Sequence, residues 1–404
     1  MAHPVYDPFD PAFQADPYPA YAWLREHDPV HHRPKTSQAP AYWALTRFDD
    51  IWDAVRRPED FSSAQGLTFY PDEIGQLGLA PTIVMLDPPV QTELRGLIGK
   101  GFTPRRVAAL EDRIRAFVRS LLAGFGPGTD LHRDFSSRIP TFVLAELLGV
   151  PEGDRERFDP WVATLTAIAD DGFAPTAVAG AETVAEMFEY FAGVIAERRE
   201  RPQDDLVGAL VAAEVEGPDG SRQRLSDWDI LGFCFVMVAG GNDTTGALIS
   251  HGVGLLDKFP DERKLLLDDP GLIPGAVAEF LRMESSVQGL ARTTTRDVEV
   301  RGVTIPAGEK VLMLYGSANR DEAEFGPDAD RLDVRRDAPR HLGFSSGPHF
   351  CIGNHLAKLQ ARVAFEELLA AQPHIGVGSG AGVRHHSAFT RGWSTLPATR
   401  VVAP

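Results

Sequence analysis

The chain has 404 residues, of which 43% are hydrophobic and 24% charged, a composition typical of a globular protein that can bury a sizeable core. Its formal net charge of −17 argues against a nucleic-acid binder, because a phosphate backbone requires clustered Lys and Arg on its partner. Its two cysteines, Cys234 and Cys351, exclude a disulfide scaffold, a four-cysteine zinc site and a self-contained iron–sulfur cluster.

The predicted elements begin with a short strand and continue mainly as helices. Tyr42–Leu45 has a strand-like pattern, and helical periodicity dominates further along the chain. Residues 1–21 are rich in Pro and Asp and contain no apolar stretch that could serve as a signal peptide or anchor, which predicts a cytoplasmic protein. Since no internal repeat or linker composition occurs, we expect residues 1–404 to form a single domain.

The most apolar stretch, Ile230–Gly241, predicts a buried helix. It is far shorter than the ~20 residues needed to cross a bilayer, so we expect no membrane span. Ser226 and Asp229 form a variant of the capping box, and the helix is predicted to run from there as one element until Pro260.

Residues 239–245 are unusual for the interior of an apolar helix. Gly240 and its neighbouring glycine each cost roughly 1 kcal/mol of helix propensity relative to Ala, and Asp243 and Thr244 follow shortly after. Glycines leave room for a ligand against the helix, and a hydroxyl supplied by a carboxylate can deliver protons to a reacting oxygen. The alternative is a close helix crossing with a buried acid satisfied by its neighbours.

The last third of the chain mixes helix and strand patterns. Glu279 and Arg282 lie three residues apart on one predicted helical face, where they can form an ion pair. Residues 297–315 change to a period of two around a Pro-Ala-Gly turn and predict a small β meander. Helical spacing returns after Gly353, so the fold class predicted is mostly α with a minor β part.

Cys351 lies in a loop, Phe344–Gly353, that opens directly into a predicted helix. Free backbone N–H groups and the positive end of the helix dipole stabilise an anionic sulfur there, and glycines let the backbone approach a flat cofactor. A thiolate bound to haem iron donates electron density that favours O–O cleavage. The alternative is a small buried hydrophobe, and this interpretation holds for Cys234 in its apolar helix.

The loop fits the pattern F-x-x-G-x-H-x-C-x-G at every defined position, and a chance match is on the order of one in ten thousand or less. The chain therefore resembles the cytochrome P-450 superfamily, in particular its soluble bacterial type. The resemblance implies one large domain enclosing haem b, with Cys351 as the axial iron ligand and Phe344 shielding the sulfur. Ser345 stands where the family usually has a second glycine.

The same resemblance assigns roles elsewhere. Asp243 and Thr244 match the acid–alcohol pair of the oxygen-activating helix, beside the groove at Gly240. Glu279 and Arg282 match a structural ion-pair motif whose third member is an arginine further on. Arg336 is the candidate for that arginine, with Arg331 in reserve.

Several positions match residues that hold the haem, chiefly its propionates. Gln91 stands where the family usually has a histidine, so this contact is expected to be weaker or rearranged. The full set expected at the cofactor is Gln91, Arg95, Gly240, Arg292, His341, Phe344, His349, Cys351 and Gly353.

The implied reaction inserts one atom of dioxygen into a C–H bond of an apolar small molecule. Its substrate would be a lipid, terpenoid, sterol or aromatic compound, and the protein a monomer. Ferredoxin and ferredoxin reductase would supply two electrons, docking near a basic patch of Arg105, Arg106, Lys358 and Arg362. The residues expected to line the substrate pocket are Phe69, Val84, Val238, Ala239, Val287, Leu290 and Trp393.

Two other functions fit the same fold. A peroxide-driven peroxygenase would not need the pair Asp243 and Thr244, and a non-catalytic haem-binding module would be expected to lose this pair or Cys351. The presence of all three residues argues against both alternatives.

Overall fold

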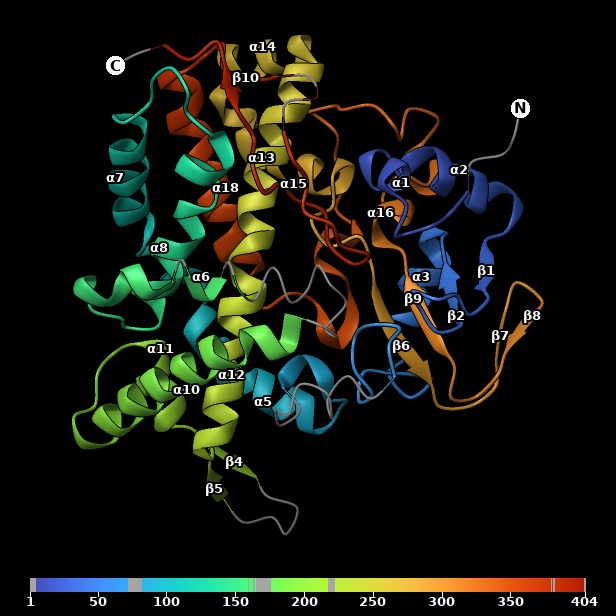
Figure 1. Cartoon of the computed structure of the whole chain (residues 1–404), viewed down its shortest axis with the longest axis horizontal. Coiled ribbons are helices and arrows are strands. Elements are labelled where there is room, and N and C mark those ends of the chain that lie inside the picture. The colour runs from blue at the N-terminus through green and yellow to red at the C-terminus, as the bar shows by residue number, and fades with distance from the viewer. Residues whose placement is uncertain are drawn as a thin grey trace.

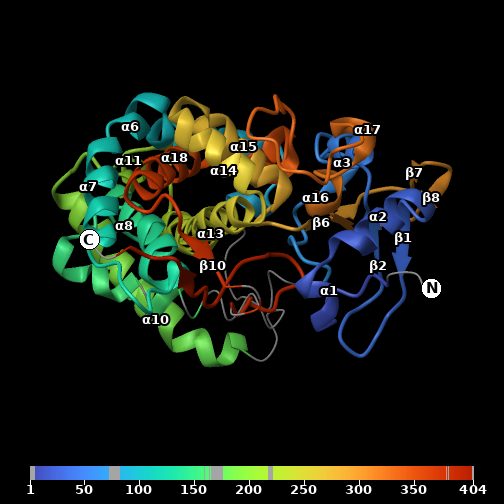
Figure 2. The same ribbon diagram turned by 90° about the horizontal axis from the view of Figure 1, so that it is seen from above.

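Helices form most of the protein, and a small sheet lies at one end of them (Figures 1 and 2). The computed structural model describes residues 5–71, 82–158, 160–162, 164, 176–216, 222–378, 380 and 382–402. The longer helices are α2 (Tyr18–His27), α5 (Val90–Gly99), α7 (Glu111–Leu122), α8 (Arg138–Leu147), α10 (Thr176–Glu200), α12 (Asp227–Gly241), α13 (Asp243–Lys258), α14 (Pro260–Asp268), α15 (Ile273–Met283) and α18 (Asn354–Ala371). None of the described helices is long and apolar enough to cross a membrane.

Shorter helical segments connect these elements. The α-helices among them are α1 (Pro11–Ala15), α3 (Phe48–Ala54), α6 (Pro104–Ala108), α11 (Leu206–Val211), α16 (Tyr315–Ala318) and α17 (Glu322–Phe325). The π-helix η3 (Leu131–Ser136) precedes α8 and packs against α13. The first predicted strand, Tyr42–Leu45, is present as β2.

The main sheet has five strands in the order β1-β2-β9-β6-β3. Its strands are β1 (Val30–Arg33), β2, β3 (Phe61–Ser62), β6 (Leu290–Thr294) and β9 (Lys310–Met313). Only β2 and β9 pair in parallel within it. Three two-stranded sheets complete the described strands: β4 (Glu214–Glu216) with β5 (Arg222–Arg224), β7 (Val298–Val300) with β8 (Val303–Ile305), and β10 (Gly376–Val377) with β11 (Ala398–Thr399).

The predicted meander over residues 297–315 is only half right. Strands β7 and β8 form the expected hairpin around Gly302, whose φ of 77° suits the turn. The third strand, β9, leaves the hairpin and pairs with β2 and β6 instead. All four residues of β9 are buried, so it needs partners in the main sheet and not an exposed hairpin edge.

Helices α13, α15 and α18 pack against one another at the centre of the helical part (Figure 1). Phe280 of α15 and Phe365 of α18 have ring centroids 5.0 Å apart, and both rings touch α13 at Gly252. A Cβ on Gly252 would lie 2.4 Å from Phe365, so a glycine is required for α13 to approach this closely. This contact fixes the position of α13, the helix that carries Asp243 and Thr244.

The predicted single helix from Ser226 to Pro260 is interrupted. Ser226 and Asp229 form the expected capping box, and α12 begins there. However, α12 ends at Gly241, and α13 starts at Asp243 after Asn242, whose φ and ψ are −94° and −67°. The break falls within the glycine-rich segment, where backbone freedom makes a distortion cheapest.

The ion pair predicted for α15 is present and fully buried. Arg282 and Glu279 are joined by two hydrogen bonds of 2.7 Å, and Arg336 reaches the same carboxylate at 3.2 Å. Arg282 also donates to the carbonyl oxygens of Asn319 and Ala329 at 2.7 Å. The pair thus ties α15 to the chain segment that leads toward Cys351.

We predict that Glu279→Ala lowers the free energy of unfolding by about 3–5 kcal/mol, because Arg282 would remain buried without its carboxylate. Urea unfolding of the cofactor-loaded protein, followed by circular dichroism, measures the change. Lys264→Ala is the control, since it breaks the exposed pair between Lys264 and Asp268, whose loss has little effect on stability. Equal stability of the two variants would contradict a structural role for the buried pair.

Candidate active site

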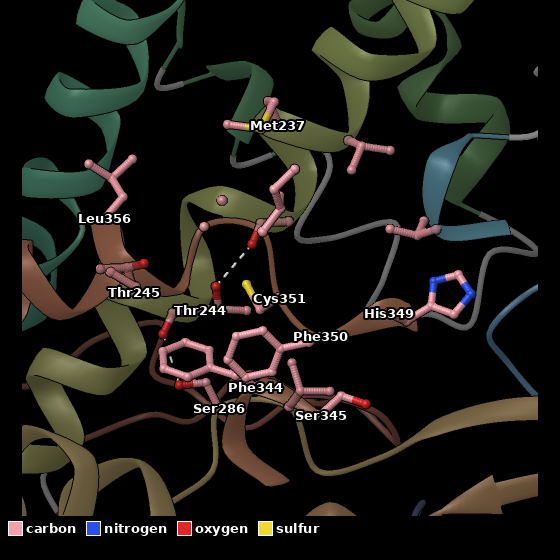
Figure 3. Close-up of a pocket in the computed structure, with 18 of the residues that line it drawn as sticks. Met237, Thr244, Thr245, Ser286, Phe344, Ser345, His349, Phe350, Cys351 and Leu356 are labelled. Carbon is pink, nitrogen blue, oxygen red and sulfur yellow. Dashed lines mark hydrogen bonds between the residues drawn. The ribbon is translucent and has the colours of Figure 1, made fainter. Parts of the chain in front are cut away.

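Cys351 lies in a short loop that follows the 3-10 helix η7 (Gly347–His349) and directly precedes α18 (Figure 3). Its backbone N–H donates to the carbonyl oxygen of Phe344 at 2.9 Å, which closes the loop. Gly347 has a φ of 68°, and a Cβ there would lie 2.7 Å from the carbonyl oxygen of Val55. Glycine is therefore required for the loop to rest on that backbone, and the sulfur is held in a fixed turn.

Ser345 adopts a backbone conformation that favours glycine. Its φ and ψ are 57° and −161°, a region in which other residues pay on the order of 1–3 kcal/mol. The Ser345 hydroxyl lies 3.2 Å from that of Tyr315, a hydrogen bond that offsets part of the strain. The loop thus keeps its shape although serine replaces the usual glycine.

Two groups stabilise the thiolate form of Cys351 against the effect of burial. Burial raises the pKa of the thiol, while a backbone hydrogen bond from Gly353 and the positive charge of Arg95 lower it. A metal cation on the sulfur would supply the rest of the stabilisation. Within the described parts of the chain no cluster of three or more His, Cys, Asp or Glu could hold a metal.

The start of α13 forms the opposite side of the site. Thr244 donates its hydroxyl to the carbonyl oxygen of Gly240 at 2.9 Å, and its own carbonyl oxygen accepts from Ser286 at 2.8 Å (Figure 3). The Asn242 side chain donates to Thr141 of α8 at 2.8 Å. These side-chain hydrogen bonds replace some of the backbone hydrogen bonds that are lost at the helix break, and they hold the hydroxyl of Thr244 beside the site.

A cavity of about 300 Å³ lies between Cys351 and Thr244 (Figure 3). Most of its wall is apolar, and it draws on elements far apart in the sequence. Besides Cys351 and Thr244, its lining includes Ile83, Val84, Phe102, Pro140, Leu144, Phe233, Met237, Gly240, Leu248, Val287, Leu290, Phe344, Phe350, Gly353 and Leu356. Pro140 and Leu144 of α8 were missed by the sequence analysis, because nothing local marks which helix will face a distant cavity.

Three of the seven residues predicted for the substrate pocket, Val84, Val287 and Leu290, line this cavity. The other four do not. Phe69 stacks on Tyr42 in an aromatic cluster under the N-terminal helices, with ring centroids 4.4 Å apart.

The remaining three positions face other surroundings. Val238 is fully buried in the helical core, and Ala239 is exposed on α12. Trp393 packs under the guanidinium of Arg384, 3.8 Å from the ring centroid. Apolar character alone did not distinguish the cavity wall from these other packing sites.

Two arginines near the site have no carboxylate partner among the described residues. Arg292 is 3% exposed, and its one hydrogen bond to a described residue goes to the carbonyl oxygen of Ala291 at 2.8 Å. Arg95 lines the cavity, burial lowers its pKa, and it forms no ion pair with any described residue. A buried cation without a counter-charge is costly, so these residues fit an acidic ligand.

The polar residues expected beside these arginines have protein partners. Gln91 donates its side-chain amide to the carbonyl oxygen of Pro348 at 2.7 Å, within the cysteine loop. His349 lies 3.2 Å from the hydroxyl of Ser63, and His341 accepts from the backbone N–H of Gly343 at 3.2 Å. Burial lowers the pKa of both histidines to about 4, so they are neutral at pH 7. The Gln91 amide therefore holds the cysteine loop.

Asp243, the expected partner of Thr244, lies outside the cavity wall. The two residues are adjacent on α13, so their side chains project from different faces of the helix. Burial raises the pKa of Asp243, and the charge of His132 lowers it, which places the carboxylate near η3. The structure therefore brings Thr244 but not Asp243 to the cavity.

A lone thiol that faces a hydroxyl across an apolar cavity, near cations without carboxylate partners, is the arrangement of a haem-thiolate oxygenase. A family model described as Cytochrome P450 matches residues 272–371. The chain is 46% identical over 388 residues to cytochrome P450 130 of Mycobacterium tuberculosis, which covers 95% of this chain and 94% of the relative. It is 39% identical over 404 residues to the vitamin D(3) 25-hydroxylase of Pseudonocardia autotrophica, with 98% and 96% covered.

The fold agrees with these relatives. A solved structure of a cytochrome P450 from Mycobacterium marinum in complex with pseudoionone superposes with a TM-score of 0.87 at 35% identity, over 99% of this chain and 100% of that chain. The chain belongs to the cytochrome P450 family. It is accordingly a haem-binding monooxygenase that uses dioxygen.

The residues of the site fit a haem. Cys351 offers a sulfur ligand, the glycines Gly240 and Gly353 leave the cavity wall free of bulk, and Arg95 and Arg292 would face the propionates. The cofactor would supply the redox chemistry that activates dioxygen.

We predict that Arg292→Leu accelerates haem loss by roughly tenfold or more, because a hydrogen bond to a charged group contributes about 1.5–3 kcal/mol. Transfer of haem to an excess of apomyoglobin, followed by absorbance, measures the rate. Arg301→Leu removes a cation paired with Asp50 far along the β7–β8 hairpin and serves as the control. Identical rates in the two variants would refute the propionate contact of Arg292.

Proposed function

We propose that this chain hydroxylates an apolar small molecule with dioxygen, haem b and two electrons from a ferredoxin and its reductase. The observation that carries the proposal is the cavity of about 300 Å³, in which Cys351 and Thr244 are among the few polar groups on a mostly apolar wall. An apolar wall binds an apolar substrate and excludes water from the reacting atoms.

In this proposal the residues of the site have separate roles. Cys351 holds the iron, and Arg95 and Arg292 hold the propionates of the haem. Thr244 keeps a proton at its Oγ1 on the cavity wall, next to the place where a substrate would bind. Asp243, on the neighbouring face of α13, replaces that proton, and burial, which raises the pKa of its carboxyl, favours the protonated form that can donate.

The relatives support an apolar substrate. The names of two of them refer to vitamin D(3) and to pseudoionone, and a 35% identical relative from Mycobacterium tuberculosis is named a methyl-branched lipid omega-hydroxylase. We propose a lipid, terpenoid, sterol or aromatic substrate on this basis. A titration of the ferric protein with one compound of each class, followed by the change of spin state, identifies the substrate probe for the measurements below.

A ferredoxin would dock on the side of the cysteine loop. Of the four basic residues expected there, Arg106 pairs with Asp204, and Arg362 pairs with Glu111 and Glu366. Lys358 is half-buried over the ring of Phe344.

Arg105 is exposed and has no acidic partner among the described residues, so it is the best candidate for a contact with an acidic ferredoxin. We propose that the protein acts as a monomer in this encounter.

The first test is the absorption spectrum of the reduced, carbon monoxide-bound protein. We predict the band of a thiolate-ligated haem, and its replacement by the band of a neutral-ligand haem in Cys351→Ser. The control is Cys234→Ala, which removes the other buried cysteine from α12 and leaves the band unchanged. A neutral-ligand band in the unsubstituted protein would overturn the assignment of Cys351.

The second test concerns Thr244. We predict that Thr244→Ala lowers product formed per NADPH consumed by about tenfold and releases the missing electrons as hydrogen peroxide, because the proton donor is lost from the wall. Thr244→Ser keeps the hydroxyl and restores the coupling. If Thr244→Ala couples as well as the unsubstituted protein, the proton role of this residue is refuted.

A further inference from the structure

The π-helix η3 covers the face of α13 that carries Asp243. Asp243, Gly246 and Ser250 are spaced by three and four residues, so they share one face of the helix. A Cβ on Gly246 would lie 3.2 Å from Cα of Ser137 and 3.3 Å from the carbonyl oxygen of Ser136, so the end of η3 rests directly on the backbone of α13. The carboxylate of Asp243 therefore faces η3 and not the substrate cavity.

His132 of η3 is the titratable side chain on this face. It is 8% exposed, and its Nδ1 lies 3.2 Å from the hydroxyl of Ser250, while its Nε2 has no hydrogen-bond partner among the described residues. A neutral imidazole with one nitrogen bonded and the other free can accept a proton on one side as it releases one on the other.

His132 and Asp243 interact electrostatically. Burial lowers the pKa of His132, and the charge of Asp243 raises it. Burial raises the pKa of Asp243, and the charge of His132 lowers it. Burial therefore moves the two pKa values toward each other, which favours the exchange of a proton between the two groups.

Unpartnered polar atoms flank this pair. Ser136 Oγ and Asn242 Oδ1 are buried and have no hydrogen-bond partner in the described part of the chain. Ser136 ends η3, and Asn242 directly precedes Asp243. Buried polar atoms of this kind are usually satisfied by internal water.

A second buried histidine, His385, belongs to the C-terminal segment that contacts the start of η3. The backbone N–H of Leu396 donates to the carboxylate of Asp130 at 3.0 Å, which places the C-terminal segment beside the start of η3. The charge of His385 in that segment lowers the pKa of His132. His385 is 6% exposed, and its Nδ1 has no described partner.

A small cavity adjoins His385. This cavity of about 20 Å³ has room for one water molecule, and its wall includes His385, Thr390, Gln14 and Arg384. Thr390 Oγ1 lies 3.2 Å from Nε2 of His385. The cavity lies where the N-terminal and C-terminal segments meet, on a side separate from the substrate cavity.

We propose that His132 is a positioning residue that supplies protons to Asp243, and that His385 and buried water resupply His132 from the junction of the two terminal segments. The proposal rests on the proposed function, in which Asp243 serves Thr244. In each transfer a proton leaves one ring nitrogen of His132 for the carboxylate of Asp243, and the other ring nitrogen regains a proton from the outer side. No electrons change place.

The charged groups that face His132 determine in which direction its pKa should shift in each variant. Asp243 from α13 and Asp130 from the start of η3 raise the pKa of His132, while His385 and Arg133 lower it. Removal of the Asp243 charge therefore lowers the pKa of His132 further. His251 is the matched control, because it is also a buried histidine of α13 but faces Glu284 and Arg384.

The deciding experiment is a pH titration of histidine side-chain NMR signals in the reduced, carbon monoxide-bound protein, which is diamagnetic. His132→Gln and His251→Gln assign the two signals. We expect Asp243→Asn to shift the pKa of His132 downward and to leave that of His251 unchanged. An unmoved His132, or an equal shift of both histidines, would overturn the proposal without any measurement of activity.

Turnover gives the second readout, with the compound of largest spin-state change as the probe. His132→Gln keeps an amide for Ser250 but cannot carry a proton, and we expect about threefold lower coupling and a larger solvent hydrogen isotope effect. His251→Gln should couple like the unsubstituted protein. If it is impaired equally, the effect of His132 is structural and the proposal fails.

The same assay distinguishes a failure of the supply route through His132 from a failure of the proton role of Asp243. Lower coupling in Asp243→Asn together with unchanged coupling in His132→Gln would overturn only the supply route through His132. Unchanged coupling in both variants would overturn the proton role of Asp243 as well, and with it that part of the proposed function.

Discussion

The structure depends on the burial of charged groups in an apolar interior. The thiol of Cys351 and the guanidinium group of Arg95 border one apolar cavity, and Arg292 is buried on β6, the strand that contributes Leu290 to the same wall. Each of these groups is unfavourable there alone. A bound haem would offset all three costs, since its iron would bind the sulfur and its propionates would neutralise the cations. Cofactor and protein core would then be parts of one electrostatic arrangement, and the helices around the cavity would gain stability from the bound group.

Elsewhere the chain satisfies buried charge with its own residues. Glu279 and Arg282 pair within α15, and Glu284 at the end of that helix pairs with Arg391 at 3.0 Å. Arg391 also donates to the carbonyl oxygen of Ala15, at 2.9 Å, so the same cluster ties the C-terminal segment to the N-terminal one. The cations around Glu284 hold the pKa of its carboxyl well below the usual range. Its charge, and the tie between the two segments, persist at acidic pH because the folded-state pKa is depressed.

Local patterns predicted those parts of the molecule in which near neighbours in sequence decide the structure. The cysteine loop, the capping box of Ser226 and the pair of Glu279 with Arg282 all depend on residues within ten positions of each other. The contact of Arg336 with Glu279 spans a longer distance and was predicted from the family resemblance. The family resemblance showed that Ser345 replaces a glycine, but the strained φ of Ser345 can be seen only in the structure.

Features set by tertiary contacts could not be predicted. At the break in the helix, Asn242 bonds to Thr141 of a distant helix. Strand β9 pairs with β2 and β6 and not with the β7–β8 hairpin that precedes it. Phe69 and Trp393 are as apolar as the residues of the cavity wall, so hydrophobicity could not tell a packing site from a binding site.

The orientation of α13 has a consequence for the chemistry of the site. Adjacent residues of a helix project about 100° apart, so Thr244 can face the substrate cavity while Asp243 faces η3. An acid on the cavity wall would be desolvated by each apolar substrate and would compete with it for space. Placed behind the helix, Asp243 can exchange protons with polar groups of η3 while the cavity stays apolar. The close contact at Gly246 makes this separation possible, because it lets η3 lie against α13 beside the carboxylate.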